Sequence, residues 1–224
     1  MALYQSTYHS RLYRDFLAIE PKDFRKVIRF YEEQEPQIVE LEFDERFELL
    51  AAYTNALFEV GAYRQHLAIV DETIEASFSH PSQAMAKVGR FSHLLFRKAA
   101  AFYQTHRLDQ AEYILRELIR INPDNDDAVR FLRKTLYQQH RPLLRRSQAI
   151  AILIFMVTAL IIGVEVLLVR PFLAHFTTLI ELTRTGFFGT GVLILAVGEG
   201  YAYWRAYRST ERFLQEVRLR KGRA

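Results

Sequence analysis

The sequence predicts an all-α protein in which a helical-hairpin domain is followed by a transmembrane helical hairpin. Apolar residues in residues 1–140 recur at the three- and four-residue spacing of one helix face, without convincing strand alternation. Glycine, which weakens helices, occurs there only at positions 61 and 89. Residues 141–224 instead contain two long apolar stretches of the kind that cross membranes.

The charge of the chain is divided unevenly between these two parts. The net charge is +4, but residues 1–140 carry 18 Lys and Arg against 21 Asp and Glu, whereas residues 141–224 carry 12 against 5. An anionic membrane surface attracts such a basic border, so we expect a lipid bilayer as a partner and no nucleic acid. The absence of cysteine excludes disulfides, zinc–thiolate sites and Cys nucleophiles.

The helices of the first part are expected as apolar stripes between turn residues. Turns are indicated by Gly61, by His80-Pro81-Ser82 and by the segment around Pro123. We expect an N-terminal helical segment (1–44) and a helical domain (45–140). The candidate helices are Leu3–Ile19, Asp23–Glu33, Arg46–Val60, Tyr63–Phe78, Gln83–Tyr103, Leu108–Ile121 and Asp127–His140.

The transmembrane hairpin is expected over residues 141–204, followed by a basic tail (205–224). The first stretch, Ala149–Val169, has 21 residues and a single charge, Glu165. As a helix it covers ~31 Å, about the thickness of a bilayer core, and a buried core helix is the alternative. The second stretch, 186–203, is Gly-rich with aromatic residues at both ends, as membrane boundaries favour. A re-entrant or interfacial helix is the alternative there.

Flanking positive charges predict the orientation, because Lys and Arg concentrate on the cytoplasmic side. Arg141, Arg145 and Arg146 precede the first stretch, and the tail after the second is rich in Arg, whereas the connecting segment 170–185 has two Arg. We expect both termini in the cytoplasm. Arg outnumbers Lys 24 to 6, which favours a bacterial inner membrane, with a mitochondrial outer-membrane anchor as the second choice.

The segment from Leu95 to Ala128 resembles a tetratricopeptide repeat (TPR). Ala99, Phe102, Ala111 and Pro123 fit the spacing of the small, aromatic and closing residues of that family. Lys98 and His106 depart from the pattern. A degenerate unit runs from about Leu50 to His80, where His66 replaces a small residue, and its turn lies 45 residues from the next instead of 34. A helical bundle of another kind is the alternative.

The resemblance implies a domain that binds protein partners and is not an enzyme. The first helix of each TPR lines the binding groove, so the resemblance maps the partner-binding positions onto the five residues His93, Phe96, Ala100, Tyr103 and Gln104. Phe96 and Ala100 occupy the Lys and Asn positions of the chaperone-binding carboxylate clamp, which makes a chaperone C-terminus an unsuitable ligand. The alternative is that this aromatic face packs against the chain's own helices.

Other polar features carry weaker expectations. Glu32–Glu48 has eight acidic residues and one base, which suits either a basic partner or a solvated surface. The seven His are scattered, and Asp124, Asp126 and Asp127 lack the rest of a Ca²⁺ loop, so we expect no metal, no cofactor and no catalytic residues.

Four residues of the hairpin are candidates for membrane assembly: Glu165, Gly186, Gly189 and Glu199. Carboxylates within membranes are functional candidates, and glycines allow close helix approach. For the two carboxylates the alternative is anchoring at the membrane interface, where Glu199 could reach Arg205 or water. For the glycines the alternative to a homo-oligomer is packing within the hairpin. We therefore expect a membrane-anchored scaffold for a protein partner or, as the alternative, an accessory subunit of a transport, channel or secretion complex.

Overall fold

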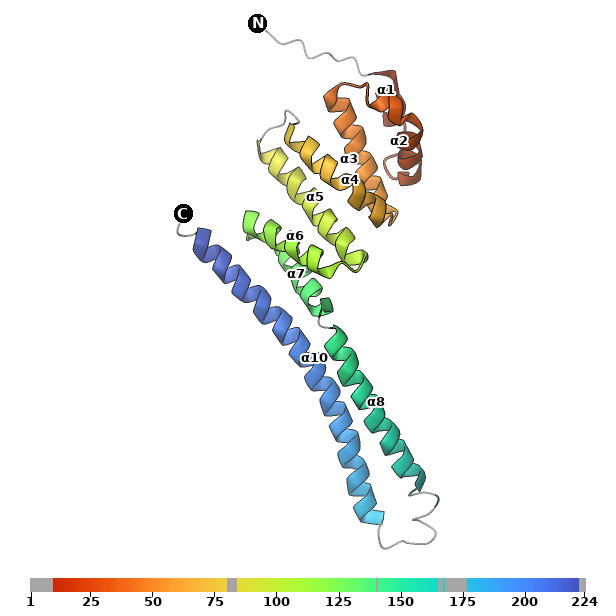
Figure 1. Cartoon of the computed structure of the whole chain (residues 1–224), viewed down its shortest axis with the longest axis vertical. Helices are drawn as coiled ribbons and strands as arrows, with labels where there is room; N and C mark the ends of the chain where they lie inside the picture. The colour runs from red at the N-terminus through yellow and green to blue at the C-terminus, as the bar shows by residue number, and fades with distance from the viewer. Residues whose placement is uncertain (1–9, 80–83, 140, 165–166, 168–176, 222–224) are drawn as a thin grey trace. The chain divides into compact units, whose positions relative to one another are not determined.

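The computed structural model describes residues 10–79, 84–139, 141–164, 167 and 177–221, and all regular elements among them are helices (Figure 1). The prediction of an all-α protein is therefore confirmed. The chain divides within α7 (Asp126–Gln139) into two compact units, Met1–Val129 and Arg130–Ala224. Each unit is described by itself below.

The first unit is a succession of helices, each packed against the next from α2 to α6. Their bounds are α1 Arg11–Leu17, α2 Phe24–Ile38, α3 Phe43–Glu59, α4 Tyr63–Ser79, α5 Ala84–Gln104 and α6 Leu108–Ile121. These bounds agree with the predicted helices to within a few residues, except at α1 and α2. The predicted helix from Leu3 begins outside the described residues.

Helix α2 extends to Ile38, five residues beyond the predicted end at Glu33, and includes Pro36. Ile38 is 1% exposed and shares a core cluster with Tyr13 and Leu49. Burial of a side chain of this size stabilises a fold by about 1.5–3 kcal/mol, which offsets much of the cost of about 3 kcal/mol for a proline inside a helix. Tertiary packing therefore decides where α2 ends.

The α3–α4 and α5–α6 pairs are two helical hairpins closed by the same turn. Gly61 (φ 80°) and His106 (φ 60°) both adopt the left-handed conformation. In each turn the next amide, Ala62 or Arg107, donates to the carbonyl five residues earlier, at 2.9 Å. This is the Schellman arrangement, which satisfies the free carbonyls at a helix end. His106 occupies a position at which glycine carries no steric cost.

The cores of the two hairpins correspond when 45 is added to each residue number of the first. Val70 and Leu115 are both fully buried, as are the pairs Thr54–Ala99, His66–Ala111 and Thr73–Leu118. Corresponding residues therefore face the inside of each hairpin. The TPR-like identity of this repeat stays a prediction.

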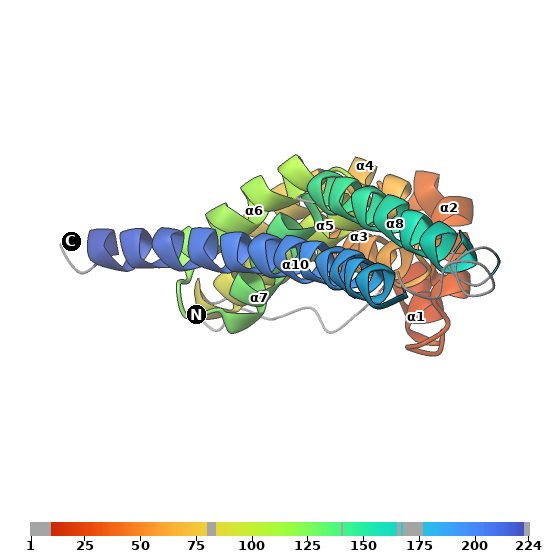
Figure 2. The same cartoon turned by 90° about the horizontal axis from the view of Figure 1, so that it is seen from below.

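The second unit contains a long antiparallel pair, α8 (Arg141–Val164) and α10 (Thr177–Lys221), which run side by side in both views (Figures 1 and 2). A Cβ at Gly191 would lie 2.6 Å from Phe155 Cε1, and one at Gly198 would lie 2.7 Å from Ser147 Oγ. Two glycines of α10 thus permit close approach to α8.

Helix α10 differs from the expected order of connecting segment, span and tail. It is a single helix of 45 residues that begins inside the predicted connecting segment and continues to Lys221 through the predicted tail. No proline interrupts it, and Arg220 pairs with Glu216 one turn earlier at 2.6 Å. The basic tail is therefore helical as far as the structure describes it.

One described helix is apolar and long enough to cross a membrane. Its window Ser147–Val164 has a mean hydropathy of 2.4, and 11% of it is buried, unlike the core helix of a soluble protein. No second helix in the described part of the chain meets this criterion. The stretch 186–203 contains five glycines and Glu199, which lower its hydropathy, so the structure does not confirm the second span.

Candidate partner-binding face and membrane hairpin

The five predicted partner-binding residues all belong to α5, on one side of the helix. His93 and Gln104 are exposed, whereas Phe96, Ala100 and Tyr103 are half-buried. His93 borders two cavities, Phe96 borders one of these, and Gln104 borders a third cavity between the two hairpin turns. Three of the five predicted residues, His93, Phe96 and Gln104, therefore border separate hollows along α5.

The first cavity has a volume of about 320 Å³ and lies among α3, α4 and α5. Most of its wall is apolar, with polar groups contributed by a few side chains, as is usual for ligand sites. Residues that line it include Phe47, Ala51, Thr54, His66, Leu94 and Arg97. A second cavity of about 480 Å³ shares Gly89, His93 and Arg97 with the first and adds Phe96.

Arg97 connects the walls of these two cavities. Its Nη2 donates to Glu59 Oε1 at 2.7 Å, and its Nε donates to His93 Nε2 at 3.2 Å. The guanidinium carbon lies 4.8 Å from the centroid of the Phe58 ring, a cation–π distance. The third nitrogen, Nη1, is buried and has no hydrogen-bond partner in the structure. Burial and the Arg97 charge lower the pKa of His93, so this ring is neutral at pH 7.

His66 is a fully buried histidine on the wall of the first cavity. Its Nδ1 lies 2.9 Å from the Thr54 carbonyl oxygen, which can only accept, so Nδ1 carries a proton and donates. Burial lowers the pKa of His66, although the bond to the carbonyl opposes the shift. The ring is therefore neutral, its Nε2 is an acceptor, and that nitrogen has no partner. An unsatisfied buried polar atom costs about 1–3 kcal/mol.

In the sequence, His66 stands out only as a departure from the TPR pattern, and nothing in the pattern singles out Arg97. A comparison of the two hairpins could have singled out His66. It corresponds to Ala111 of the second hairpin, and its partner Thr54 corresponds to Ala99. A large polar residue in the place of a small one at a helix contact indicates either a polar core or a site. The structure shows a polar cluster, since Thr54 Oγ1 and Thr73 Oγ1 lie 2.7 Å apart.

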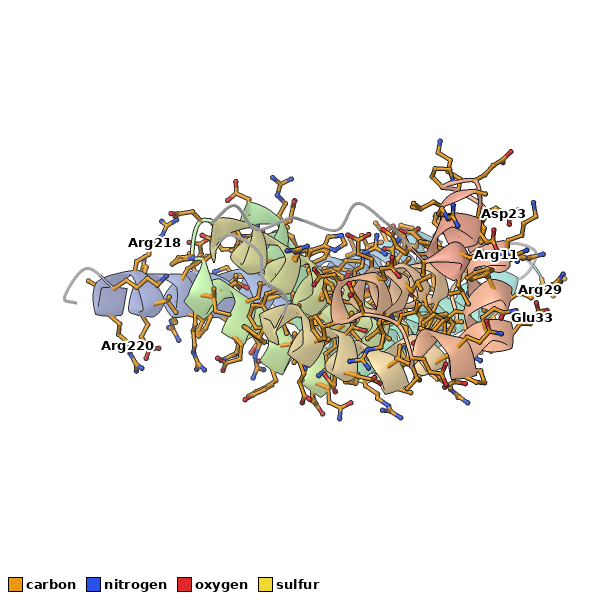
Figure 3. All side chains as sticks on the ribbon, turned by 90° about the horizontal axis from the view of Figure 1, so that it is seen from above. Arg11, Asp23, Arg29, Glu33, Arg218 and Arg220 are labelled. Carbon is orange, nitrogen blue, oxygen red and sulfur yellow. The ribbon has the colours of Figure 1, made fainter. Side chains whose placement is uncertain are left out.

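The acidic segment Glu32–Glu48 is used partly inside the first unit. Glu32 accepts from the Tyr53 hydroxyl at 3.2 Å, Glu45 accepts from the Ser10 amide at 2.9 Å, and Glu48 accepts from the Tyr13 hydroxyl. Burial and the neighbouring Glu32 charge raise the pKa of Tyr53 to about 12. Glu33 points away from α2, near Arg29 in the view of Figure 3. This distribution favours the interpretation of a solvated surface with some structural carboxylates.

The four membrane-assembly candidates do not form one site in the part of the chain that the structure describes. Gly186 and Gly189 have no heavy atom within 4 Å of an added Cβ, so they do not contribute to packing against α8. Glu199 accepts a hydrogen bond from the Tyr137 hydroxyl at 2.6 Å, whereas the expected partners were Arg205 or water. Glu165 lies outside the described residues. Packing within the hairpin is instead provided by Gly191 and Gly198.

Within the described part of the chain, no three His, Asp or Glu side chains are grouped so that they could hold a metal ion. No family model, curated protein or solved structure matches the chain.

Proposed function

We propose that this chain is a membrane-anchored scaffold that binds a protein partner through its first unit, a TPR-like domain in the cytoplasm. The observation that carries the proposal is the combination of two features in one chain. One is an apolar helix that is almost entirely unburied, and the other is a repeated helical hairpin with open, mostly apolar hollows along α5.

Membrane attachment through a two-span hairpin is supported by the pairing of α8 with α10. Helix α10 approaches α8 closely at Gly191, next to Phe155 of the first apolar stretch, and at Gly198, next to Ser147 just before that stretch. If Ser147–Val164 lies in a bilayer, the paired stretch of α10 is in the same environment. Exposed apolar side chains occur on both helices, including Leu153, Met156, Leu160, Phe188, Leu193 and Val197.

Positive charge supports an orientation with both termini in the cytoplasm, in a bacterial inner membrane. Arg218 and Arg220 extend from the C-terminal part of α10 (Figure 3). Other arginines lie earlier in the same part of α10 and just before the first span, on the side that the positive-inside rule assigns to the cytoplasm. Each Lys or Arg near an anionic leaflet contributes about 1 kcal/mol of attraction.

An accessory subunit of a membrane complex is the second candidate, and the open surface at Gly186 and Gly189 favours it. Such a surface lets a helix of another protein, or of a second copy, approach closely. In that case the partner contacts the hairpin rather than α5.

Site-specific photo-crosslinking in living cells separates the two candidates. A photoreactive phenylalanine analogue is placed at Phe96, Tyr103 or Gln104 on α5, at Gly189 or Leu193 on α10, and at the exposed Tyr113 on α6 as a control. The scaffold proposal predicts one protein adduct from the α5 positions and none from Tyr113. Adducts from Gly189 and Leu193 alone would refute the scaffold proposal and support the accessory subunit.

Alanine substitution provides a second test. Phe96→Ala and Tyr103→Ala should reduce recovery of the crosslinked partner with the chain from mild detergent, whereas Gly189→Ala and Glu199→Ala should not. The opposite pattern would contradict partner binding by α5.

A further inference from the structure

Helix α10 has one continuous exposed face on which the side chains change character along the helix. Residues that follow one another at three- or four-residue spacing lie on the same side of a helix. Towards the C-terminus this face carries first aliphatic, then aromatic and then cationic side chains, all exposed: Leu193, Val197, Tyr201, Trp204, Arg205 and Arg208. A phospholipid has the same order, from its acyl chain through its ester region to its headgroup.

The arginines of this face are not neutralised, because the nearby carboxylates have other partners. Arg212 continues the face one turn beyond Arg208 and is also exposed. Within the described part of the chain, none of Arg205, Arg208 and Arg212 has an ion-pair partner. The carboxylates of α10 from residue 199 onward are each engaged elsewhere: Glu199 with Tyr137 at 2.6 Å, Glu211 with Arg133 at 3.3 Å and Glu216 with Arg220 at 2.6 Å.

Two of the three arginines lie at headgroup depth when the second apolar stretch, which ends at Tyr203, spans the bilayer. Arg205 and Arg208 are then ~3 Å and ~7.5 Å beyond Tyr203 along the helix axis, and the headgroup layer of one leaflet is about 5–7 Å thick. Arg208 also leans back towards the apolar stretch, since its guanidinium carbon lies 4.8 Å from the centroid of the Trp204 ring. Arg212, ~14 Å beyond Tyr203, lies outside this layer.

A headgroup with a net negative charge matches this arrangement better than a zwitterionic one does. A guanidinium group presents a planar fork of donors that binds two phosphate oxygens at once. The contact with the Trp204 ring holds the Arg208 fork in one direction. The ammonium group of a zwitterionic lipid would add a further positive charge beside two arginines that lack a counter-ion, whereas the headgroup of phosphatidylglycerol adds none.

We propose that Arg205 and Arg208 bind the phosphate group of an anionic phospholipid. Tyr201 and Trp204 lie against the ester region of the same lipid, and its acyl chain follows Val197 and the aliphatic residues before it. This inference rests on the membrane attachment in the proposed function. It adds to that function a preference for one class of lipid at one face of α10.

Trp204 is the only tryptophan of the chain, so its fluorescence reports which lipid occupies this face. The full chain is reconstituted in phosphatidylcholine vesicles that contain a minor fraction of either phosphatidylglycerol or phosphatidylcholine with bromine atoms near the ester end of the acyl chains. Bromine quenches tryptophan at short range, so the ratio of the two quenching efficiencies gives the lipid preference beside Trp204. We expect phosphatidylglycerol to be preferred about tenfold or more, because two arginines contribute.

Variants with a matched control connect this preference to the two arginines. Arg205→Gln and Arg208→Gln should each lower the preference about fivefold, because each removes a charge beside the phosphate. Arg212→Gln removes the same charge from the same face beyond the headgroup layer, and it should lower the preference less than about twofold because of screening. The double variant Arg205→Lys/Arg208→Lys keeps both charges but should still lower the preference, because lysine lacks the fork. Each ratio compares two lipids in one protein, so a changed Trp204 environment cancels.

Four results would overturn the inference. They are equal quenching by the two lipids in the wild type, equal losses in all three Gln variants, an undiminished preference in the double Lys variant, or displacement of phosphatidylglycerol by inorganic phosphate. The second and third would indicate general attraction to a charged surface, and the fourth a site for a soluble anion.

Failure of membrane attachment would have a different signature. Neither brominated lipid would then quench Trp204, and both the attachment and the lipid site would be refuted. A chain that is quenched equally by both lipids would keep its membrane attachment and lose only the lipid site.

Discussion

The two units of this chain use leucine and glycine in opposite ways. In the first unit, leucines such as Leu115 are fully buried, and Gly61 lies at a turn with a φ of 80°. In the second unit, Leu153 and Leu160 are 64% and 70% exposed, whereas Gly191 lies inside a helix against Phe155. Water drives apolar side chains to the inside of the first unit. In a bilayer that driving force is absent, and close helix contacts replace it.

The largest contrast is expected from one substitution made in both units. Leu115→Ala should lower the free energy of unfolding of the first unit by about 2–5 kcal/mol, because it leaves a cavity in a dense core. Leu153→Ala should change stability by less than about 0.5 kcal/mol, because its side chain contacts solvent or lipid rather than protein. Guanidinium titrations of the full chain, followed by circular dichroism, measure both. Equal losses would contradict the description of α8 as an outward-facing apolar helix.

The glycines of α10 provide the next contrast. Gly191→Leu should separate α8 from α10, because even a Cβ there would lie 2.6 Å from Phe155, and overpacking of this kind costs about 1–3 kcal/mol. Gly189→Leu, two residues away on an open face, is the matched control. Spin labels at Leu160 and Phe187, both exposed, report the separation of the helices. A distance that stays unchanged in Gly191→Leu would refute the glycine-mediated contact.

Substitution of glycine by alanine should change the stability of the first unit in opposite directions at its two glycines. Gly61→Ala should destabilise by about 1 kcal/mol, because alanine tolerates a positive φ poorly. Gly89→Ala should instead stabilise by about 0.5–1 kcal/mol, because it replaces glycine within α5. Thermal unfolding of the two variants tests this pair. A gain in Gly61→Ala would show that the turn does not need its left-handed conformation.

The smallest effect is expected from pH. Burial holds the pKa of folded His66 below its value in the unfolded chain, so below about pH 6.5 the unfolded state binds more protons. Stability should therefore fall as the pH drops from about 6.5 toward the folded pKa, and it should be constant above that range. The fall should be smaller in His66→Leu, in which this group no longer titrates. His93, whose pKa is also lowered, titrates in both proteins and serves as the common background.

Much of the fold was predictable from the sequence because local patterns determine it. The predicted helix Leu108–Ile121 has the observed bounds, since it begins after a tight turn and ends next to the Asn122-Pro123 break. The extension of α2 through Pro36 was not predictable, because it depends on Ile38 packing against residues distant in sequence. The continuity of α10 into the basic tail was not predictable either, because the sequence changes there from apolar to charged residues without any residue that marks a helix end.

The candidate site was predictable only in part. Helical spacing placed the five α5 residues on one side, but the cavity depends on side chains from three helices. The unpaired Nε2 of His66 follows from where the Thr54 carbonyl lies, which no spacing along the chain specifies. The corresponding residue of the second hairpin, Ala111, indicates that a small apolar side chain is sufficient for packing at this position. The histidine in the first hairpin is therefore the unusual residue.

Membrane topology is the most direct test of the account, and the absence of cysteine makes it simple to measure. Single cysteines are introduced as Gln104→Cys, His175→Cys and Arg220→Cys, and intact bacterial spheroplasts are treated with a membrane-impermeant maleimide. The account predicts labelling of the residue 175 variant alone, with the other two labelled only after lysis. Labelling of the residue 220 variant in intact spheroplasts, or protection of all three until lysis, would contradict a two-span hairpin with both ends in the cytoplasm.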